Sequence, residues 1–440
     1  MKILLFSPAL THRIQYISQF LFERLMGLEV TLTSAKSTFL TFAGPRINYS
    51  TAHFEASCFY IEAHSILGES DVKQQHIEVR HDLEYPYFFA SSTDESHFPF
   101  DLLAFSFYLL SRYEEYLPFQ PDQHDRFSAQ QSLAYQEGFL RLPIIDLWAK
   151  RLRAQLQQKF PYLVFKTPEY TYLPTYDIDH AWAYLNKGIW RTLGAAGADL
   201  LHGRLPSFFF RWTTQLGLSP DPYQRFDFLN ELHQSREVQP IYFFLLGDYG
   251  PYDKNIDPQK PAFQQLIRQL AEQYSVGIHP SYQSNEEVKR VRSEQNRLEA
   301  ITGQSVRLSR QHFLRLRLPK TYRELIRIGI EVDYSMGYAA EIGFRAGTAM
   351  DFLWFDLLAN ELTPLKLIPF QVMDVSLKNY LGLSPEEAMR KVEPLIEHCR
   401  AVGGCFCSLW HNSSFAPMDG WTEEWMAFYQ QLFDCASREG

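Results

Sequence analysis

The feature that most constrains the fold is a regular alternation of short strands and amphipathic helices that begins near residue 166. The strand candidates are short runs rich in β-branched and aromatic residues, and the helix candidates repeat apolar residues at helical spacing. This alternation is typical of parallel strands joined by crossover helices. The predicted strands cover residues 171–176, 241–246, 276–279, 306–312, 331–335, 367–373 and 405–410. The predicted helices cover residues 224–233, 261–274, 286–301, 321–328, 385–401 and 423–436.

Polar side chains stand at the carboxyl end of nearly every predicted strand. They are Asp177, Asp179, Asp248, His279, Arg310, His312, Asp333, Asp374 and His411. Barrel active sites are assembled from such strand ends, whereas an open sheet gathers its ligands at one switch point. The sequence also lacks the common glycine-rich nucleotide-binding motifs. We therefore predict an α/β fold with a distorted (β/α)7-type barrel over residues 166–440.

The first 165 residues do not continue this regular alternation of strands and helices. At 440 residues the chain is long enough for two domains, or for one barrel with an appendage. Residues 1–95 are predicted to form a small α/β domain of unknown role, and residues 96–165 a helical bridge. The expected strands are 3–6, 30–32, 58–61 and 77–79, and the expected helices are 13–26, 99–117 and 142–160.

Net charge, apolar runs and cysteine count limit the partners and the compartment that we expect for this protein. The net charge is −9 and no basic block occurs, which argues against nucleic acid as a partner. No apolar run reaches the roughly 18–20 residues of a membrane span, and the first apolar run is shorter than the roughly 7–15 residues of a signal peptide. The odd number of cysteines, five, argues against a disulfide framework. We expect a cytoplasmic protein without a membrane span; the oligomeric state stays open.

Five short motifs could carry chemistry. They are TYDIDH at 175–180, GIHPSY at 277–282, SRQH at 309–312, MD at 373–374 and LWHN at 409–412. Each also has an ordinary structural explanation, such as a turn aspartate, a hydrogen-bonded core histidine or a surface ion pair. Their order along the chain is more informative than any one of them.

In that order the motifs resemble those of the polysaccharide deacetylase (NodB-type) family, over about residues 166–415. The combination of GIHPSY, DYSMGY, GFRAGT and SLWHN resembles a bacterial subgroup with an extra N-terminal domain of unknown function. The resemblance implies a metal-dependent hydrolase that removes acetyl from an N-acetylated sugar or cleaves a related amide. It implies Asp177 as the general base, oriented by Arg310, and His411 as the general acid, paired with Asp374.

The resemblance also implies that Asp179 and His279 bind a divalent metal, zinc first, with cobalt, nickel or manganese as alternatives. The family pattern has a second histidine four residues after the first, where this chain has Gln283. A carboxamide is a poorer zinc ligand than an imidazole. Gln283 or a water could complete a weaker site, or His312 or His180 could reach it. Otherwise the metal is lost and the barrel is a metal-free carbohydrate-binding or assembly protein. We predict that His312 joins the pocket.

The expected partner is a carbohydrate or small amide substrate. Five residues are assigned to its contact: Asp248, Tyr249, Tyr282, Arg345 and Trp410. Asp248 and Tyr249 follow a strong strand, where simple loop chemistry is the competing explanation. Arg345 in GFRAGT is a candidate clamp for an anion or a carbonyl, against a solvated arginine as the alternative.

Overall fold

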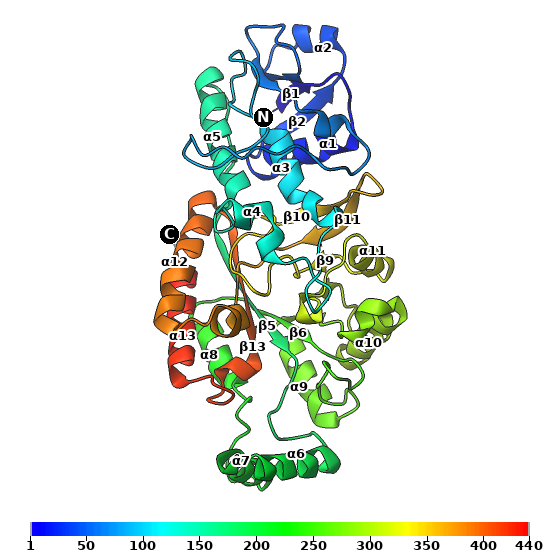
Figure 1. The fold of residues 1–440 in the computed structure, drawn as a ribbon, viewed down its shortest axis with the longest axis vertical. Coiled ribbons are helices and arrows are strands. Elements are labelled where there is room, and N and C mark those ends of the chain that lie inside the picture. Colours follow the sequence, from blue (N-terminus) through cyan, green and yellow to red (C-terminus); the bar gives the residue numbers. More distant parts are fainter. Residues whose placement is uncertain (1, 439–440) are drawn as a thin grey trace.

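The computed structural model describes residues 2–438, without the side chain of Glu286. It is elongated (Figure 1): a small sheet lies at one end, a large sheet with its helices lies in the middle, and a helical hairpin projects at the other end.

The small sheet has four parallel strands in the order β2-β1-β3-β4. Its elements are β1 (Lys2–Phe6), α1 (His12–Ser18), a π-helical turn (Gln19–Arg24), β2 (Glu29–Thr33), α2 (Lys36–Thr41), β3 (Arg46–Ser50) and β4 (Phe59–Glu62). The strand expected at 77–79 does not form, and β3 was not expected. The fourth strand of the sheet is β3, which lies between β1 and β4.

The predicted helical bridge contains α3 (Leu102–Leu110), a 3-10 turn (Tyr113–Tyr116), α4 (Leu133–Gln136) and α5 (Ile144–Lys159). Every residue of α3 is buried, as its continuous apolar sequence predicts. Its N-terminus is capped by the Asp101 carboxylate, which accepts from the Ala104 amide at 2.9 Å. The same carboxylate accepts from the Tyr49 hydroxyl of β3 at 2.7 Å. The cap therefore also fastens α3 to the small sheet.

The large sheet has nine strands in the order β10-β11-β9-β8-β7-β6-β5-β13-β12. They are β5 (Thr171–Ile178), β6 (Ile241–Phe244), β7 (Ser275–Ile278), β8 (Leu308–Ser309), β9 (Val332–Asp333), β10 (Phe352–Asp356), β11 (Glu361–Leu367), β12 (Val372–Met373) and β13 (Cys405–His411). All neighbours are parallel except β10 and β11. Within the segment 361–373, Lys366 and Leu367 pair with β9, and Val372 and Met373 pair with β13.

The helices that follow these strands are α6 (Ile189–Leu201), α7 (Leu205–Gln215), α8 (Phe226–Ser235), α9 (Pro261–Ala271), α10 (Val288–Thr302), α11 (Lys320–Arg327), α12 (Pro385–Val402) and α13 (Glu423–Ser437). All but α6 and α7 were predicted. In the part of the chain that is described, no helix has the length and apolar character needed to cross a bilayer.

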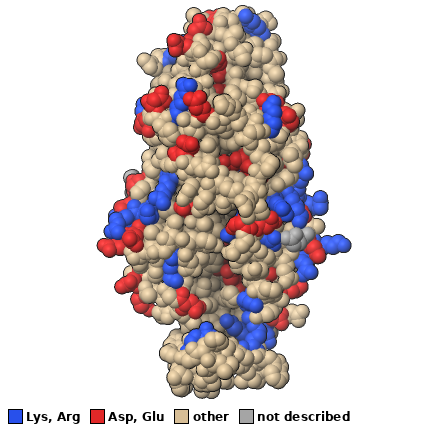
Figure 2. Space-filling view, in the orientation of Figure 1, with Lys and Arg blue, Asp and Glu red and all other residues tan. Residues whose placement is uncertain are grey.

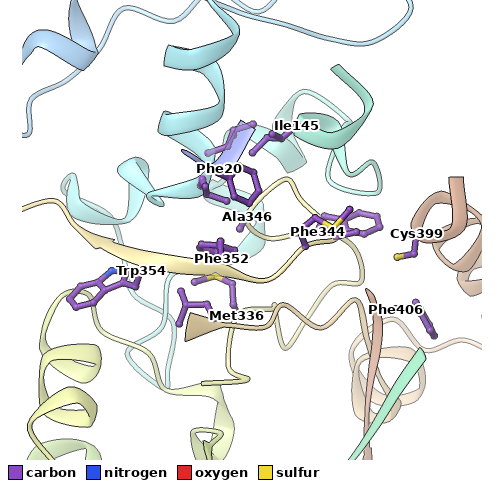
Figure 3. Packing of buried hydrophobic residues seen from close by; sticks show 14 of the residues in the cluster. Phe20, Ile145, Met336, Phe344, Ala346, Phe352, Trp354, Cys399 and Phe406 are labelled. Carbon is purple, nitrogen blue, oxygen red and sulfur yellow. The ribbon is translucent and has the colours of Figure 1, made fainter. Parts of the chain in front are cut away.

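One hydrophobic cluster extends through all three predicted regions of the chain. Figure 3 shows Phe20 of the N-terminal region and Ile145 of α5 packed near Ala346 and Phe352 of the region that follows. The Tyr16 hydroxyl donates to the Leu353 carbonyl of β10 at 2.8 Å. The N-terminal region therefore packs directly on the β10–β11 hairpin.

Candidate metal and catalytic site

Three side chains from neighbouring strand ends meet in one cluster. Asp179 follows β5, His279 follows β7, and His312 lies three residues beyond β8. Their ligand atoms all lie within 4.8 Å of one another. His279 Nε2 is 3.3 Å from one Asp179 oxygen and His312 Nε2 is 3.6 Å from the other. Because β5, β6, β7 and β8 are consecutive parallel strands of the sheet, their carboxyl ends bring the three residues to the same edge.

The two histidines are oriented through their other ring nitrogens. His279 Nδ1 donates to the Arg310 carbonyl at 2.6 Å. His312 Nδ1 donates to Asp253 Oδ1 at 2.9 Å, and Asp253 in turn accepts from the Tyr282 amide at 2.8 Å. Each Nε2 is thereby directed at Asp179, as in metal sites where a hydrogen bond fixes the ring. From the sequence, Asp253 lies in a loop for which substrate contact and simple loop chemistry are both open interpretations, and its bond to His312 is not predicted.

Charge and burial at this cluster fit a divalent cation. Asp179 Oδ1 is buried and has no hydrogen-bond partner among the described residues. Burial raises the pKa of Asp179, but His312 and His279, which face its two oxygens, lower it by more, so the pKa lies well below its usual range. Burial lowers the pKa of His312, whereas Asp179 and Asp253 raise it to about 9. An ion bound at Nε2 would replace that proton.

A second carboxylate, Asp177, lies beside the cluster. Its Oδ1 accepts from Arg310 Nη1 at 3.1 Å, and its Oδ2 is 3.7 Å from His279 Nε2. The Arg310 side chain is fully buried and lies 4.6 Å from the centre of the Phe243 ring. Its Nε donates to the Tyr334 carbonyl, which fixes the plane of the guanidinium. Asp177 is therefore held by one oxygen, and its other oxygen faces the cluster.

His411 lies on the other side of Asp179, with its Nε2 3.7 Å from Asp179 Oδ2. Its Nδ1 donates to Asp374 Oδ1 at 2.9 Å, and its backbone amide donates to Asp374 Oδ2 at 2.7 Å. The Ser414 hydroxyl donates to the same carboxylate. Burial lowers the pKa of His411, but the Asp374 charge and hydrogen bond raise it to about 10. The Asp374 carboxylate therefore favours the imidazolium form of His411.

The structure brings His312, rather than Gln283 or His180, into the cluster. The Gln283 carboxamide oxygen accepts from Arg290 of α10 at 3.4 Å, so this side chain is turned toward α10. His180 is not among the three clustered residues, and burial lowers its pKa to about 4. The expectation that Gln283 serves as a ligand is corrected, because its side chain is engaged elsewhere.

The predicted substrate contacts are divided between two places. Tyr282 stacks on Tyr252 at 4.2 Å between ring centres, next to the loop that carries Asp253. Asp248 and Tyr249 instead line a separate pocket of about 740 Å³ between the start of α6 and the loop after β6. None of the residues of the Asp179 cluster lines that pocket.

Arg345 and Trp410 are corrected to structural roles. Arg345 is 3% exposed, and its guanidinium binds Glu115 at 2.6 Å and 2.9 Å and the Gly337 carbonyl at 2.8 Å. It has no free face for a substrate. Trp410 is 1% exposed and packs on Tyr429 of α13, at 4.9 Å between ring centres. Side chains alternate along a strand, so Trp410 and its neighbour His411 face opposite sides.

With the geometry described, the chain can be compared with known proteins. The profile of a family of unknown function (DUF7033) matches residues 3–161. No curated protein matches the chain.

Among solved structures, the chain is similar to a putative polysaccharide deacetylase from Mycobacterium smegmatis, with 14% identity, TM-score 0.39 and coverage of 62% of this chain and 87% of that one. It is also similar to the PuuE allantoinase, with 11% identity, TM-score 0.39 and coverage of 62% and 85%. A probable polysaccharide deacetylase from Pseudomonas aeruginosa PAO1 has 11% identity, TM-score 0.37 and coverage of 60% and 83%. The function therefore has to be argued from the site itself.

Proposed function

We propose that the protein is a metal-dependent hydrolase that removes acetyl from an N-acetylated sugar or cleaves a related amide. The observation that carries the proposal is the placement of Asp177 and His411 beside the same Asp179–His279–His312 cluster. A carboxylate and a protonated imidazole in one pocket are the base and the acid that amide hydrolysis requires.

We also propose that the large sheet closes as a distorted barrel. The strand order ends in β10 and β12, and β11 lies next to β10. Strands β11 and β12 are consecutive pieces of the segment 361–373, which pairs first with β9 and then with β13. Counting that segment once, β5, β6, β7, β8, β9 and β13 complete a ring of seven. Such a ring explains why side chains from strands far apart in the sequence share one pocket.

Asp179, His279 and His312 would hold the ion; nitrogen and oxygen ligands of this kind suit zinc, with cobalt, nickel or manganese as alternatives. When bound, a divalent ion supplies an acidified water and polarises the carbonyl. Among these three residues, Asp179 has a buried oxygen, Oδ1, that makes no hydrogen bond with the described residues. That oxygen is the feature that favours an ion over a purely hydrogen-bonded cluster.

The chain's own residues move the protons. Asp177 takes a proton from the attacking water at Oδ2, the oxygen that Arg310 does not hold. His411 gives its Nε2 proton to the leaving nitrogen, and Asp374 holds the ring in that orientation throughout. Arg310 places its positive charge against the proposed base, and Asp374 places its negative charge against the proposed acid.

An aromatic group next to the cluster gives a surface for a sugar ring. Tyr252, Tyr282 and Phe313 pack together, and Tyr252 is 47% exposed. Tyr252 immediately precedes Asp253, the partner of His312. We place the sugar contact at Tyr252, with Tyr282 behind it, because flat aromatic faces pack on the apolar face of a ring.

The test is acetate release from N-acetylated chitooligosaccharides by the full-length protein reconstituted with zinc or cobalt. We expect turnover, and we expect Asp177→Asn and His411→Ala each to lower it by at least about 100-fold, the usual contribution of a general acid or base. Their melting temperatures should stay near that of the wild type. Asp227→Asn and His76→Ala, at exposed positions, are the matched controls and should keep full activity.

Elemental analysis distinguishes the alternative, a metal-free carbohydrate-binding or assembly protein. A reconstituted protein without bound zinc, cobalt, nickel or manganese, and with no acetate release, would refute the hydrolase.

A further inference from the structure

The α6–α7 hairpin carries its apolar side chains on the outside. Trp190 is 84% exposed and Leu201 is 88% exposed, and other large apolar residues within 189–218 are also exposed. These are Ile189, Leu193, Leu200, Leu205, Phe209, Phe210, Leu216 and Leu218. Within each helix they recur at three- and four-residue spacing, so each helix has one apolar face turned to the surroundings.

The inside of the hairpin is polar. Asp199 of α6 and Arg211 of α7 are both buried and form an ion pair at 2.7 Å between the helices. Thr192 and Thr214 are the other buried polar residues of the pair of helices. A helix on the surface of a protein surrounded by water buries its apolar residues and exposes its polar ones. Helices α6 and α7 have the opposite arrangement. It indicates that the outer face of the hairpin meets an apolar medium.

The position and charge of the hairpin favour a lipid surface as this apolar medium. The hairpin projects from one end of the molecule (Figure 1), and in the face that Figure 2 shows this end is almost free of charged side chains, with Lys and Arg side chains gathered beside it. Residues 187–211 have a net charge of +3 in a chain of −9. Arg211 is buried in its pair with Asp199, so the cations that remain for a partner are Lys187, Arg191 and Arg204. Apolar residues bordered by cations match an anionic lipid surface.

The dimensions fit a helix pair that enters one leaflet without crossing. The 13 residues of α6 extend about 20 Å at 1.5 Å per residue, against a hydrocarbon core of about 30 Å. A second copy of this chain fits less well, because two identical hairpins in contact would bring the same cations together. We propose that the α6–α7 hairpin docks the protein on an anionic bilayer, with its apolar face in one leaflet and its cations at the headgroup phosphates.

The hairpin is also connected to the catalytic cluster. Arg191 donates to the carbonyls of Lys254 and Asn255, at 3.0 Å and 3.1 Å. These residues follow Asp253, which orients His312. Docking would therefore place the strand ends that carry the cluster toward the lipid surface. The docking proposal does not depend on the proposed reaction.

The test is co-sedimentation of the full-length protein with phosphatidylcholine vesicles, with and without phosphatidylserine. We expect binding to the anionic vesicles that weakens as salt is raised. The double variant Trp190→Asp/Leu201→Asp should bind at least about ten-fold more weakly, because two large apolar side chains no longer enter the leaflet.

The matched control is Val164→Asp/Leu358→Asp, which adds the same two charges at apolar residues that are 69% and 60% exposed outside the hairpin. It should bind like the wild type, and circular dichroism should show that all variants are folded. No sedimentation of the wild type, or equal binding by both double variants, overturns the proposal. Dimers in light scattering that only the hairpin variant loses, without vesicle binding, overturn it in favour of self-association.

Discussion

At the scale of single residues, the site depends on which nitrogen of each histidine is free. His279, His312 and His411 all commit Nδ1 to an acceptor and turn Nε2 toward Asp179. The acceptors differ in charge, since His279 donates to a neutral carbonyl and the other two donate to carboxylates. At His411 the carboxylate partner stabilises the imidazolium that the proposed acid requires. At the proposed ligands either acceptor, the carbonyl or the carboxylate, fixes the orientation of the ring.

The first prediction concerns Asp253, whose carboxylate orients His312 at 2.9 Å. Asp253→Asn should weaken zinc binding about 10–100-fold, as loss of such an orienting partner usually does. A chelator competition with the purified protein measures the change. Asp257→Asn, an exposed position on the same loop, should leave the affinity unchanged. If Asp253→Asn and the wild type bound zinc with equal affinity, the proposal that His312 is a metal ligand would be wrong.

The second prediction concerns Gln283, at the position of the family's second histidine. From sequence alone, Gln283→His should tighten metal binding. In the structure the side chain is turned to Arg290 and His312 already occupies the cluster. We therefore expect Gln283→His to leave the zinc dissociation constant within about two-fold, in the same chelator competition. A clearly tighter constant would mean that this side chain turns inward and that the sequence expectation was right.

At the scale of elements, a buried ion network joins the loop after β9 to the end of α3. Arg345 binds Glu115, and Glu115 also binds Arg112 at 2.8 Å. Burial raises the pKa of Glu115, but the charges of Arg345 and Arg112 lower it below its usual value. The GFRAGT motif is thus the anchor of the helical region on the large sheet.

The third prediction tests this network. Glu115→Gln should lower the free energy of unfolding by about 3–5 kcal/mol, because it leaves buried guanidinium groups without their full countercharge. Urea unfolding measures the loss. The control is Glu331→Gln, which breaks an ion pair with Arg307 whose side chains are more than half exposed and should cost about 1 kcal/mol or less. Similar costs for the two variants would contradict a structural role for the network.

Elements with a conventional amphipathic pattern were predictable, and the hairpin was not. Helix α12 has a capping box at Ser384 and Glu387 and ends at Gly403, and its predicted and observed ranges nearly coincide. Helices α6 and α7 have an apolar outer face and a polar contact between them. Pattern reasoning assumes that water surrounds the outer face, so it did not assign them.

At the scale of the whole molecule, the N-terminal region and the large sheet share one hydrophobic cluster. Phe107 of α3 packs on Phe355 of β10 at 5.3 Å between ring centres, and Tyr16 of α1 packs on the same ring at 5.1 Å. Removing the N-terminal region would therefore expose the β10–β11 hairpin to water. The N-terminal region and the large sheet are therefore in direct contact through large aromatic side chains.

The fourth prediction follows from this shared core. A variant without residues 1–161 should lose the cooperative thermal transition and aggregate, because it leaves several large aromatic residues exposed. Circular dichroism melting and size-exclusion chromatography measure this. Replacing residues 189–218 by a short Gly–Ser linker is the control, since no described residue of that range belongs to the cluster. A soluble truncated protein that melts cooperatively would show that the two regions fold separately.

The sequence by itself determined most strands and helices of the C-terminal part and the residues at the strand ends, but not α6, α7, β10 or most of β11. Those features are local: periodicity marks each element, and parallel strands bring their carboxyl ends to one edge. Hence the clustering of Asp177, Asp179, His279 and His411 was predictable from their positions. The mixed α/β class was predictable for the same reason.

Only the tertiary structure decided which of several similar side chains reach the cluster. His312 and Gln283 were both candidates, and the choice depends on the distances between β7, β8 and the loop that carries Asp253. Burial decided the roles of Arg345 and Trp410, because partners distant in the sequence cover them. Contacts of this kind join residues far apart in the chain, so no local pattern of the sequence records them.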